Sequence, residues 1–124
     1  MDKIVKGNVE EQDFGGKKGW FIGHMACPDS VFNNQNFEVK WAVQSKGWKE
    51  KGFGVCEKSK TMCVLIEGKF LFDFPGSEEK VILSKRGDFV FWREGEIYSS
   101  ETLEDSVLLV IRWPSIGDKK YISE

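Results

Sequence analysis

The histidine and cysteine content limits the nucleophilic and proton-transfer chemistry open to this 124-residue chain. His24, the only histidine, follows Trp20, Phe21 and Ile22 and precedes Met25. Its ring is either half-buried and satisfied by backbone groups, or it hydrogen-bonds and transfers protons in a pocket. A Ser-His-Asp or Cys-His triad could be built only around His24, and no nucleophile-elbow motif lies near it. Hydrolase chemistry therefore has little support.

The three cysteines, Cys27, Cys56 and Cys63, form no C-x-x-C pair. An odd number without that spacing argues against a disulfide framework and a structural zinc site. We expect Cys56 and Cys63 to face each other across a hairpin that turns at residues 58–60. They are then either small apolar residues of a β core, or a redox pair, or Cys56 is a reactive or ligand-lining thiol.

Two cationic side chains stand in apolar surroundings. Arg112 alternates with Leu108 and Val110. It either extends to solvent from a sheet edge or offers its fork of donors to an anionic ligand. Lys40 lies between apolar residues and poses the same question: it points to a solvated face or into a cavity.

Aromatic residues make up 14% of the chain, with ten Phe, five Trp and two Tyr. Such side chains either fill a core or line a cavity whose flat walls stack a ligand ring. Trp41, Trp48 and Trp92 are the candidates for stacking, and their alternatives are core and dimer contacts. Whether Lys40 or Trp41 faces inward depends on the orientation of the strand at residues 37–43.

Short strands must position these groups. Alternation with a period of two is clear at residues 37–43, 69–74 and 107–113, and shorter apolar segments occur at 20–25, 52–57, 61–67, 80–83, 88–92 and 96–102. Turn residues separate these segments, and no amphipathic helix is evident. We therefore predict an all-β sandwich or barrel domain over residues 19–124. Residues 1–18 are predicted to form an N-terminal arm that could pair at a sheet edge.

The composition limits the kinds of partner that the protein is expected to bind. Hydrophobic residues make up 40% and charged residues 31%, the formal net charge is −2, and the basic residues are scattered. This pattern favours a globular domain and disfavours binding to a nucleic acid polymer. Neither a signal-peptide pattern nor an apolar run long enough to span a bilayer is visible, so we expect a cytoplasmic protein that does not bind membranes.

The glycine spacing resembles that of a known family. Gly47 and Gly68 bracket one segment of the length found in the first cupin motif, while Gly87 and Gly95 match glycines of the second. Residues 37–114, which end in Arg112-Trp113-Pro114, are similar to small single-domain bacterial cupins (RmlC-like) of unassigned function. The resemblance implies a double-stranded β-helix, or jelly-roll barrel, with glycines at corners that need unusual backbone angles.

The same resemblance identifies where a cupin metal would be held. The usual ligand positions fall on Gly54, Cys56, Thr61 and Tyr98, or on Val55 and Glu57 in place of the first two. A metal centre needs three or four converging N, O or S donors, which this set does not supply. We therefore expect no metal and no cofactor, and expect Tyr98 and Thr61 to point into the barrel.

The sequence leaves three functions open. The favoured one is a non-catalytic protein that senses or sequesters a small polar, anionic or nucleotide-like ligand, with anchors among Arg112, Tyr98, Trp92, Trp41, Lys40, Cys56, Thr61 and His24. The alternative is a cupin enzyme of isomerase, lyase or oxygenase type with an atypical or absent metal site. The third is a structural role, for which edge pairing into a homodimer is expected.

Overall fold

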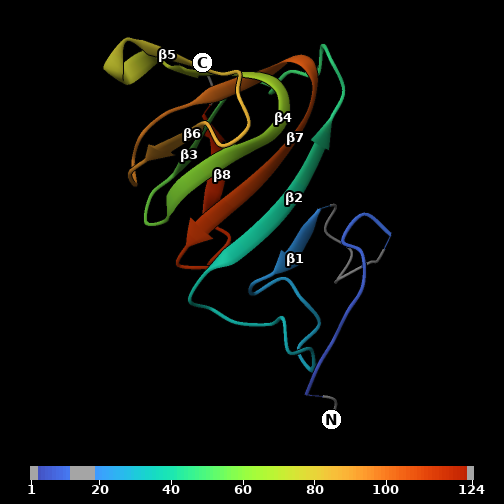
Figure 1. Cartoon of the computed structure of the whole chain (residues 1–124). Helices are drawn as coiled ribbons and strands as arrows, with labels where there is room; N and C mark the ends of the chain where they lie inside the picture. Colours follow the sequence, from blue (N-terminus) through green and yellow to red (C-terminus); the bar gives the residue numbers. More distant parts are fainter. Residues whose placement is uncertain (1–2, 12–18, 123–124) are drawn as a thin grey trace.

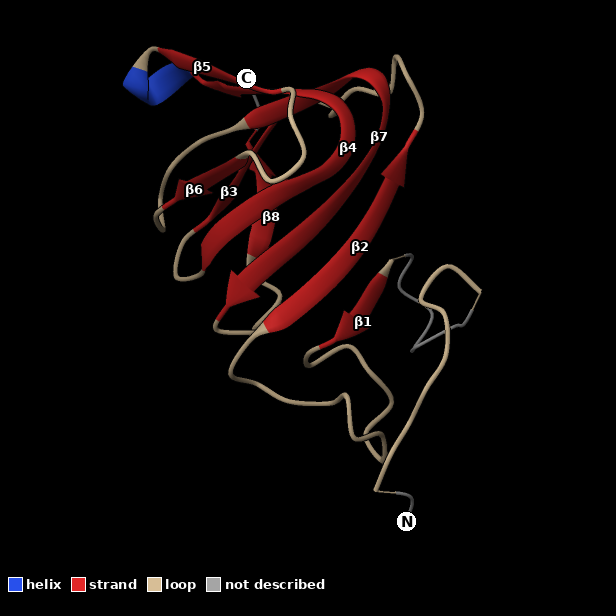
Figure 2. Ribbon diagram, in the orientation of Figure 1, coloured by secondary structure: helices blue, strands red, loops and turns tan. Residues whose placement is uncertain are grey.

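The computed structural model describes residues 3–11 and 19–122 of the chain. Almost all regular structure in it is β-strand (Figures 1 and 2). The strands are β1 (Trp20–Ile22), β2 (Glu38–Gln44), β3 (Phe53–Cys56), β4 (Lys60–Phe74), β5 (Glu79–Leu83), β6 (Phe89–Trp92), β7 (Ser99–Trp113) and β8 (Lys119–Ile122). A single 3₁₀ turn, η1 (Pro75–Ser77), precedes β5. The all-β prediction is confirmed.

No helix in the described part of the chain is long and apolar enough to cross a membrane.

Two long antiparallel strands, β4 and β7, organise the molecule and curl together through much of it (Figure 1). In one layer, β6 pairs with residues 61–64 of β4, and β2 pairs with residues 106–112 of β7. The edge strand β1 pairs with β2 in the same layer. In the other layer, residues 69–74 of β4 and 99–104 of β7 are flanked by β5 and by a segment that includes β3, with β8 beyond it. β4 and β7 are thus shared by two layers, and the space between the layers is the interior of the barrel.

The change of layer occurs at an irregularity in β4 near Gly68. Gly68 has φ +101°, and a Cβ there would lie 2.3 Å from Asp105 O and from Ser106 Oγ. The Ser106 hydroxyl accepts a hydrogen bond from the Lys69 N–H at 3.0 Å. It thereby replaces a backbone bond that the bulge interrupts. The sequence predicted a turn here between two strands, but the bulge lets one strand continue.

The other corner glycines of the predicted barrel also have positive φ: Gly47, Gly87 and Gly95. This backbone region is inexpensive only for glycine, so their expected role at corners agrees with the structure.

The predicted pairing of Cys56 with Cys63 across a hairpin is wrong. β3 pairs with β8, where Cys56 is opposite Lys119, while Cys63 on β4 is opposite Val110 on β7 and Val90 on β6. Both cysteines are buried, and neither forms a disulfide. The error arose because a short loop was taken to join paired strands, whereas here it leads from one layer into the other.

Of the predicted N-terminal arm, residues 3–11 contain no strand, and residues 12–18 lie outside the described part. The indole Nε1 of Trp41 donates a hydrogen bond to Glu10 Oε2 at 2.8 Å. The described arm therefore reaches the outer face of β2 through a side-chain contact, and the edge strand β1 begins after it.

Candidate functional site

Strand register places four inward side chains in a row across one layer. Glu38 on β2 is opposite Arg112 on β7, Arg112 is opposite Thr61 on β4, and Thr61 is opposite Trp92 on β6. The next inward row on β2 begins with Lys40, opposite Val110. Since residues two apart on a strand share a face, Lys40 points inward with Glu38 and Trp41 points outward. This answers the question that the sequence left open for residues 37–43.

Except for Glu38, the residues of these rows line a cavity of about 150 Å³ between the two layers. Side chains from both layers contribute to its wall, and polar groups are mixed with aromatic ones. The lining residues are Trp20, Lys40, Ala42, Gln44, Trp48, Glu50, Thr61, Cys63, Phe70, Phe72, Trp92, Tyr98, Ser100, Leu108, Val110, Arg112 and Lys119. Phe70, Phe72, Trp92, Tyr98 and Leu108 also belong to the buried apolar core, so a rigid cluster supports this wall.

Arg112 is anchored within the cavity wall and is only 7% exposed. Its Nη1 lies 3.5 Å from Glu38 Oε2, its Nε donates to Thr61 Oγ1 at 3.2 Å, and its guanidinium carbon lies 5.3 Å from the centroid of the Trp20 ring. β7 is a central strand, which excludes the alternative that Arg112 reaches solvent from a sheet edge. Burial lowers the pKa of Arg112, but nearby Tyr98, Cys56 and Glu38 outweigh it and the pKa is raised.

A second cation reaches the cavity from β8. Lys119 Nζ lies 3.1 Å from Glu50 Oε2 and 5.3 Å from the centroid of the Tyr98 ring. Glu50 also accepts hydrogen bonds from Tyr121 Oη at 2.6 Å and from Ser100 Oγ at 3.0 Å. Burial raises the pKa of Glu50, but Lys119 and these hydrogen bonds outweigh burial and hold the pKa below its usual value. Glu50 therefore stays ionised and paired.

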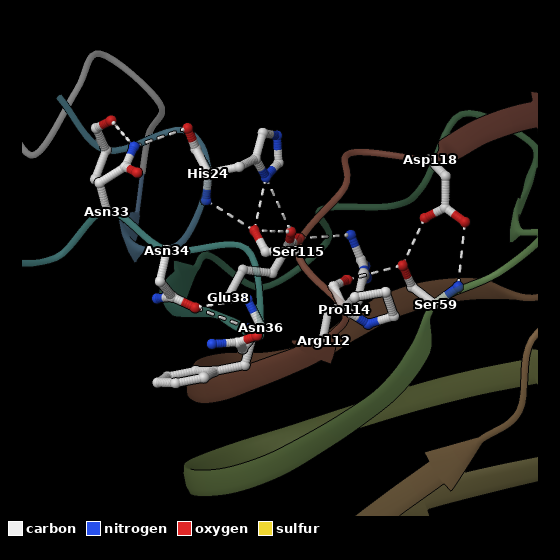
Figure 3. A network of polar contacts seen from close by, with 12 residues as sticks. His24, Asn33, Asn34, Asn36, Glu38, Ser59, Arg112, Pro114, Ser115 and Asp118 are labelled. Carbon is white, nitrogen blue, oxygen red and sulfur yellow. Dashed lines mark hydrogen bonds and ion pairs between the residues drawn. The ribbon is translucent and has the colours of Figure 1, made fainter. Parts of the chain in front are cut away.

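The position of Lys119 is secured by its neighbour Asp118. The Asp118 carboxylate accepts hydrogen bonds from the N–H groups of Lys58 and Ser59, at 2.7 and 3.1 Å, and from the Ser59 hydroxyl at 2.7 Å. These contacts join the start of β8 to the turn before β4 (Figure 3). These contacts hold Lys119, which lies near the C-terminal end of the chain, against the cavity.

Lys40 is the third cation, and no described carboxylate forms an ion pair with it. Its amine stands 5.7 Å from the centroid of the Trp20 ring, the same ring that Arg112 contacts. Burial, followed by the positive charges of Lys119 and Arg112, lowers the pKa of Lys40 and outweighs the opposing charge of Glu50. The cavity thus contains two cations paired with carboxylates and a third with none among the described residues.

Tyr98 and Trp92 form an aromatic part of the wall. Their rings lie 4.6 Å apart between centroids, and Phe72 and Phe74 pack on Trp92 at 5.4 and 5.3 Å. Burial raises the pKa of Tyr98 strongly, so its phenol is neutral at any ordinary pH. The buried indole Nε1 of Trp92 has no hydrogen-bond partner among the described residues.

Of the residues proposed from the sequence as ligand anchors, five lie on the cavity wall: Arg112, Tyr98, Trp92, Lys40 and Thr61. Trp41, Cys56 and His24 do not line it. Trp48, considered for stacking, does line it. Lys119, Glu50 and Trp20 were missed, because each reaches the cavity through contacts with residues distant in sequence that no local pattern reports.

His24 belongs to a polar network at the end of the barrel, which is linked to Arg112 of the cavity wall through Glu38 (Figure 3). The Ser115 hydroxyl accepts the His24 backbone N–H at 2.8 Å, contacts His24 Nδ1 at 2.7 Å, and donates to Glu38 Oε1 at 2.9 Å. His24 Nδ1 lies 3.4 Å from Glu38 Oε1. Serine, histidine and a carboxylate do meet here, but Ser115 is 1% exposed and has three partners, so it is not available as a nucleophile.

The cavity does not suit the metal that cupin folds often hold. No group of three or more His, Cys, Asp or Glu side chains within residues 3–11 and 19–122 is arranged to bind a metal ion. Of the residues that the sequence resemblance put at ligand positions, Thr61 already accepts a hydrogen bond from Arg112, and Tyr98 is kept neutral by its raised pKa. Arg112, Lys40 and Lys119 would also repel a divalent cation electrostatically.

Comparison with known proteins identifies the fold. No protein-family model and no curated protein matches the sequence. An uncharacterised protein with a double-stranded β-helix domain from Klebsiella pneumoniae is similar in structure, with a TM-score of 0.63, 14% identity, and 73% of this chain and 74% of that chain covered. An RmlC-like cupin from Desulfovibrio desulfuricans gives a TM-score of 0.58 at 18% identity, covering 69% and 79%.

An enzyme is also among the similar structures. The DMSP lyase DddQ from Ruegeria pomeroyi gives a TM-score of 0.60 at 15% identity, covering 73% of this chain and 45% of its own. Identities this low establish architecture alone. Together with the two shared layers built on β4 and β7, they show that this chain has the double-stranded β-helix fold of the RmlC-like cupins.

Proposed function

We propose that this protein binds a small, singly charged anion, of which a short carboxylic acid is the model, in the cavity between its two layers. The observation that carries the proposal is the charge balance of the cavity. Arg112 is paired with Glu38 and Lys119 with Glu50, whereas Lys40 has no carboxylate partner among the described residues. A partly buried cation next to two others is costly unless an anion accompanies it.

The size of the cavity supports a small ligand. A cavity of about 150 Å³ accommodates a molecule of roughly benzene's size. A short organic acid fits within this volume, whereas the nucleotide-like ligand that the sequence also allowed would extend beyond it. Apolar walls from Phe70, Leu108 and Val110 would contact the carbon skeleton, while Lys40 and Arg112 would contact the charged end.

The titratable groups of the cavity favour binding over acid–base catalysis. Burial raises the pKa of Tyr98, and it raises the pKa of the Cys63 thiol to about 12. Glu50 is occupied by three hydrogen-bonding partners. None of these side chains is poised as a general base near neutral pH.

The test is a thermal-shift series with lactate, acetate and the neutral analogue lactamide. We expect lactate to raise the melting temperature by several degrees, since a ligand at about 100 times its dissociation constant adds about 2.7 kcal/mol of stability. Lactamide should have no effect. Lys40→Met should abolish the response, and the matched surface variant Lys80→Met should retain it. The proposal fails if no small carboxylate stabilises the protein or if Lys40→Met responds like the wild type.

The expected homodimer is a separate proposal. Light scattering on the purified protein tests it directly, and a monomeric mass at all concentrations would refute it.

A further inference from the structure

Lys40 differs from the other two cations of the cavity in its immediate neighbours, and this difference suggests a chemical role beyond ion pairing. Arg112 is held by Glu38, Thr61 and Trp20, and Lys119 by Glu50. Lys40 has the Trp20 ring as its neighbour and no described carboxylate as its partner. A lysine among apolar walls and beside other cations is the arrangement in which proteins activate an amine as a nucleophile.

The geometry of β2 and β7 sets the amine beside an anion-binding group. Lys40 is opposite Val110 and Glu38 is opposite Arg112, so Lys40 and Arg112 are diagonal neighbours on the inward face. Diagonal neighbours in an antiparallel pair lie about 7–8 Å apart at Cα. Both side chains also contact the Trp20 ring, at 5.7 and 5.3 Å from its centroid. A short molecule could therefore reach both groups at once.

We propose that Lys40 forms a reversible imine with a small 2-oxo acid, whose carboxylate is held by Arg112. This inference rests on the proposed function and names the class of anion: one with a carbonyl carbon next to its carboxylate. Pyruvate, with six non-hydrogen atoms, has the size that the cavity of about 150 Å³ accommodates.

The step balances without any further reactant. The neutral amine of Lys40 adds to the carbonyl carbon, forming a C–N bond and breaking the C=O π bond, and a proton passes from the nitrogen to the oxygen. The resulting carbinolamine loses that oxygen as water, which takes a second proton from the nitrogen as the C=N bond forms. One amine and one carbonyl thus yield one imine and one water, and no electrons are transferred. The lowered pKa of Lys40, caused first by burial and then by Lys119 and Arg112, increases the fraction of neutral amine.

Trapping with borohydride tests the inference. Wild-type protein is incubated with pyruvate, reduced with sodium borohydride, and analysed by intact mass and peptide mapping. We expect one added carboxyethyl group, located on Lys40 and at least about tenfold more abundant there than on the exposed Lys80. Lys40→Arg, which keeps the charge, should lose the adduct, and Lys80→Arg should keep it. Lactate, which has a hydroxyl in place of the keto group, should give none.

The outcomes separate this inference from the proposed function. If lactate and pyruvate both stabilise the protein but borohydride gives no adduct on Lys40, anion binding stands and the imine is refuted. Equal labelling of Lys40 and Lys80, or unchanged labelling in Lys40→Arg, would also overturn it. If neither acid raises the melting temperature and no adduct forms, both proposals fail.

Discussion

Two polar clusters meet at Glu38, and they differ in whether each charged group has a partner. At the end of the barrel, His24, Ser115 and Glu38 satisfy one another at 2.7 to 3.4 Å (Figure 3). In the cavity, Lys40 lies near two further cations, and no described carboxylate pairs with it. The first cluster contains His24, the residue that the sequence offered for proton transfer, and the second contains Lys40, which the sequence offered only as a ligand anchor.

The difference shows why residue type is a poor guide to reactivity in this protein. A buried polar group that has all its partners stabilises a structure and has little left to offer a ligand. A group that lacks a partner destabilises the empty protein and gains most from a ligand. We therefore expect removal of a paired group to lower the stability of the protein, and removal of Lys40 not to lower it.

The largest effect should follow from removing Arg112, which connects the clusters. Arg112→Met leaves the Glu38 carboxylate, 3% exposed, without its cationic partner. Breaking a buried pair in this way costs about 3–5 kcal/mol. Urea denaturation should show this loss, and the double variant with Glu38→Gln should recover part of it. A loss below about 1 kcal/mol in Arg112→Met would show that Glu38 is satisfied without it.

The next largest loss of stability is expected in the network of His24, Ser115 and Glu38. Ser115→Ala removes the acceptor of the His24 N–H and a donor to Glu38. Leaving such groups without partners costs about 1–3 kcal/mol. The thermal response to lactate should remain, because Ser115 does not line the cavity. Loss of the response in a folded Ser115→Ala protein would contradict the separation of the two clusters.

Acid should reduce the stability that Glu50 contributes through its pairing with Lys119 of β8. The pKa of Glu50 is lower in the folded protein than its usual value of 4.5. Its stabilising contribution is therefore complete above pH 4.5 and declines as pH falls through the folded pKa. Glu50→Gln should cost about 1.5 kcal/mol at pH 7 and less at pH 3, measured by urea denaturation. An equal cost at both pH values would refute the role assigned to the carboxylate.

The smallest change in stability, and the only one expected to be neutral or favourable, is that of a substitution at Lys40. Its pKa is lowered on folding, so its charged form destabilises the protein at neutral pH, and this deficit disappears as pH rises from the folded pKa to the usual value of 10.5. Lys40→Met should leave stability at pH 7 unchanged or raise it by up to about 1 kcal/mol. A clear loss relative to Lys80→Met would mean that Lys40 has a stabilising partner and would weaken the case for an anion site.

The sequence alone was sufficient for the all-β class and for part of the cavity wall. Period-two alternation revealed the strands, because a half-buried sheet imposes it locally. The glycines predicted corners, since their positive φ is a local requirement of the backbone. Arg112 and Lys40 were identified because a charged side chain within an apolar strand stands out from its neighbours, and Tyr98 because the cupin resemblance puts it at a metal-ligand position.

Tertiary structure alone decided which of these groups meet. Alternation shows that Lys40 and Trp41 face opposite ways, but only the pairing of β2 with β7 and the layer opposite them makes Lys40 the inward residue. Lys119 approaches Glu50 across a sequence separation of 69 residues, and Ser115 approaches His24 across 91. Local patterns contain no record of such contacts. The charge balance of the cavity, on which the proposed function depends, therefore exists only in the folded chain.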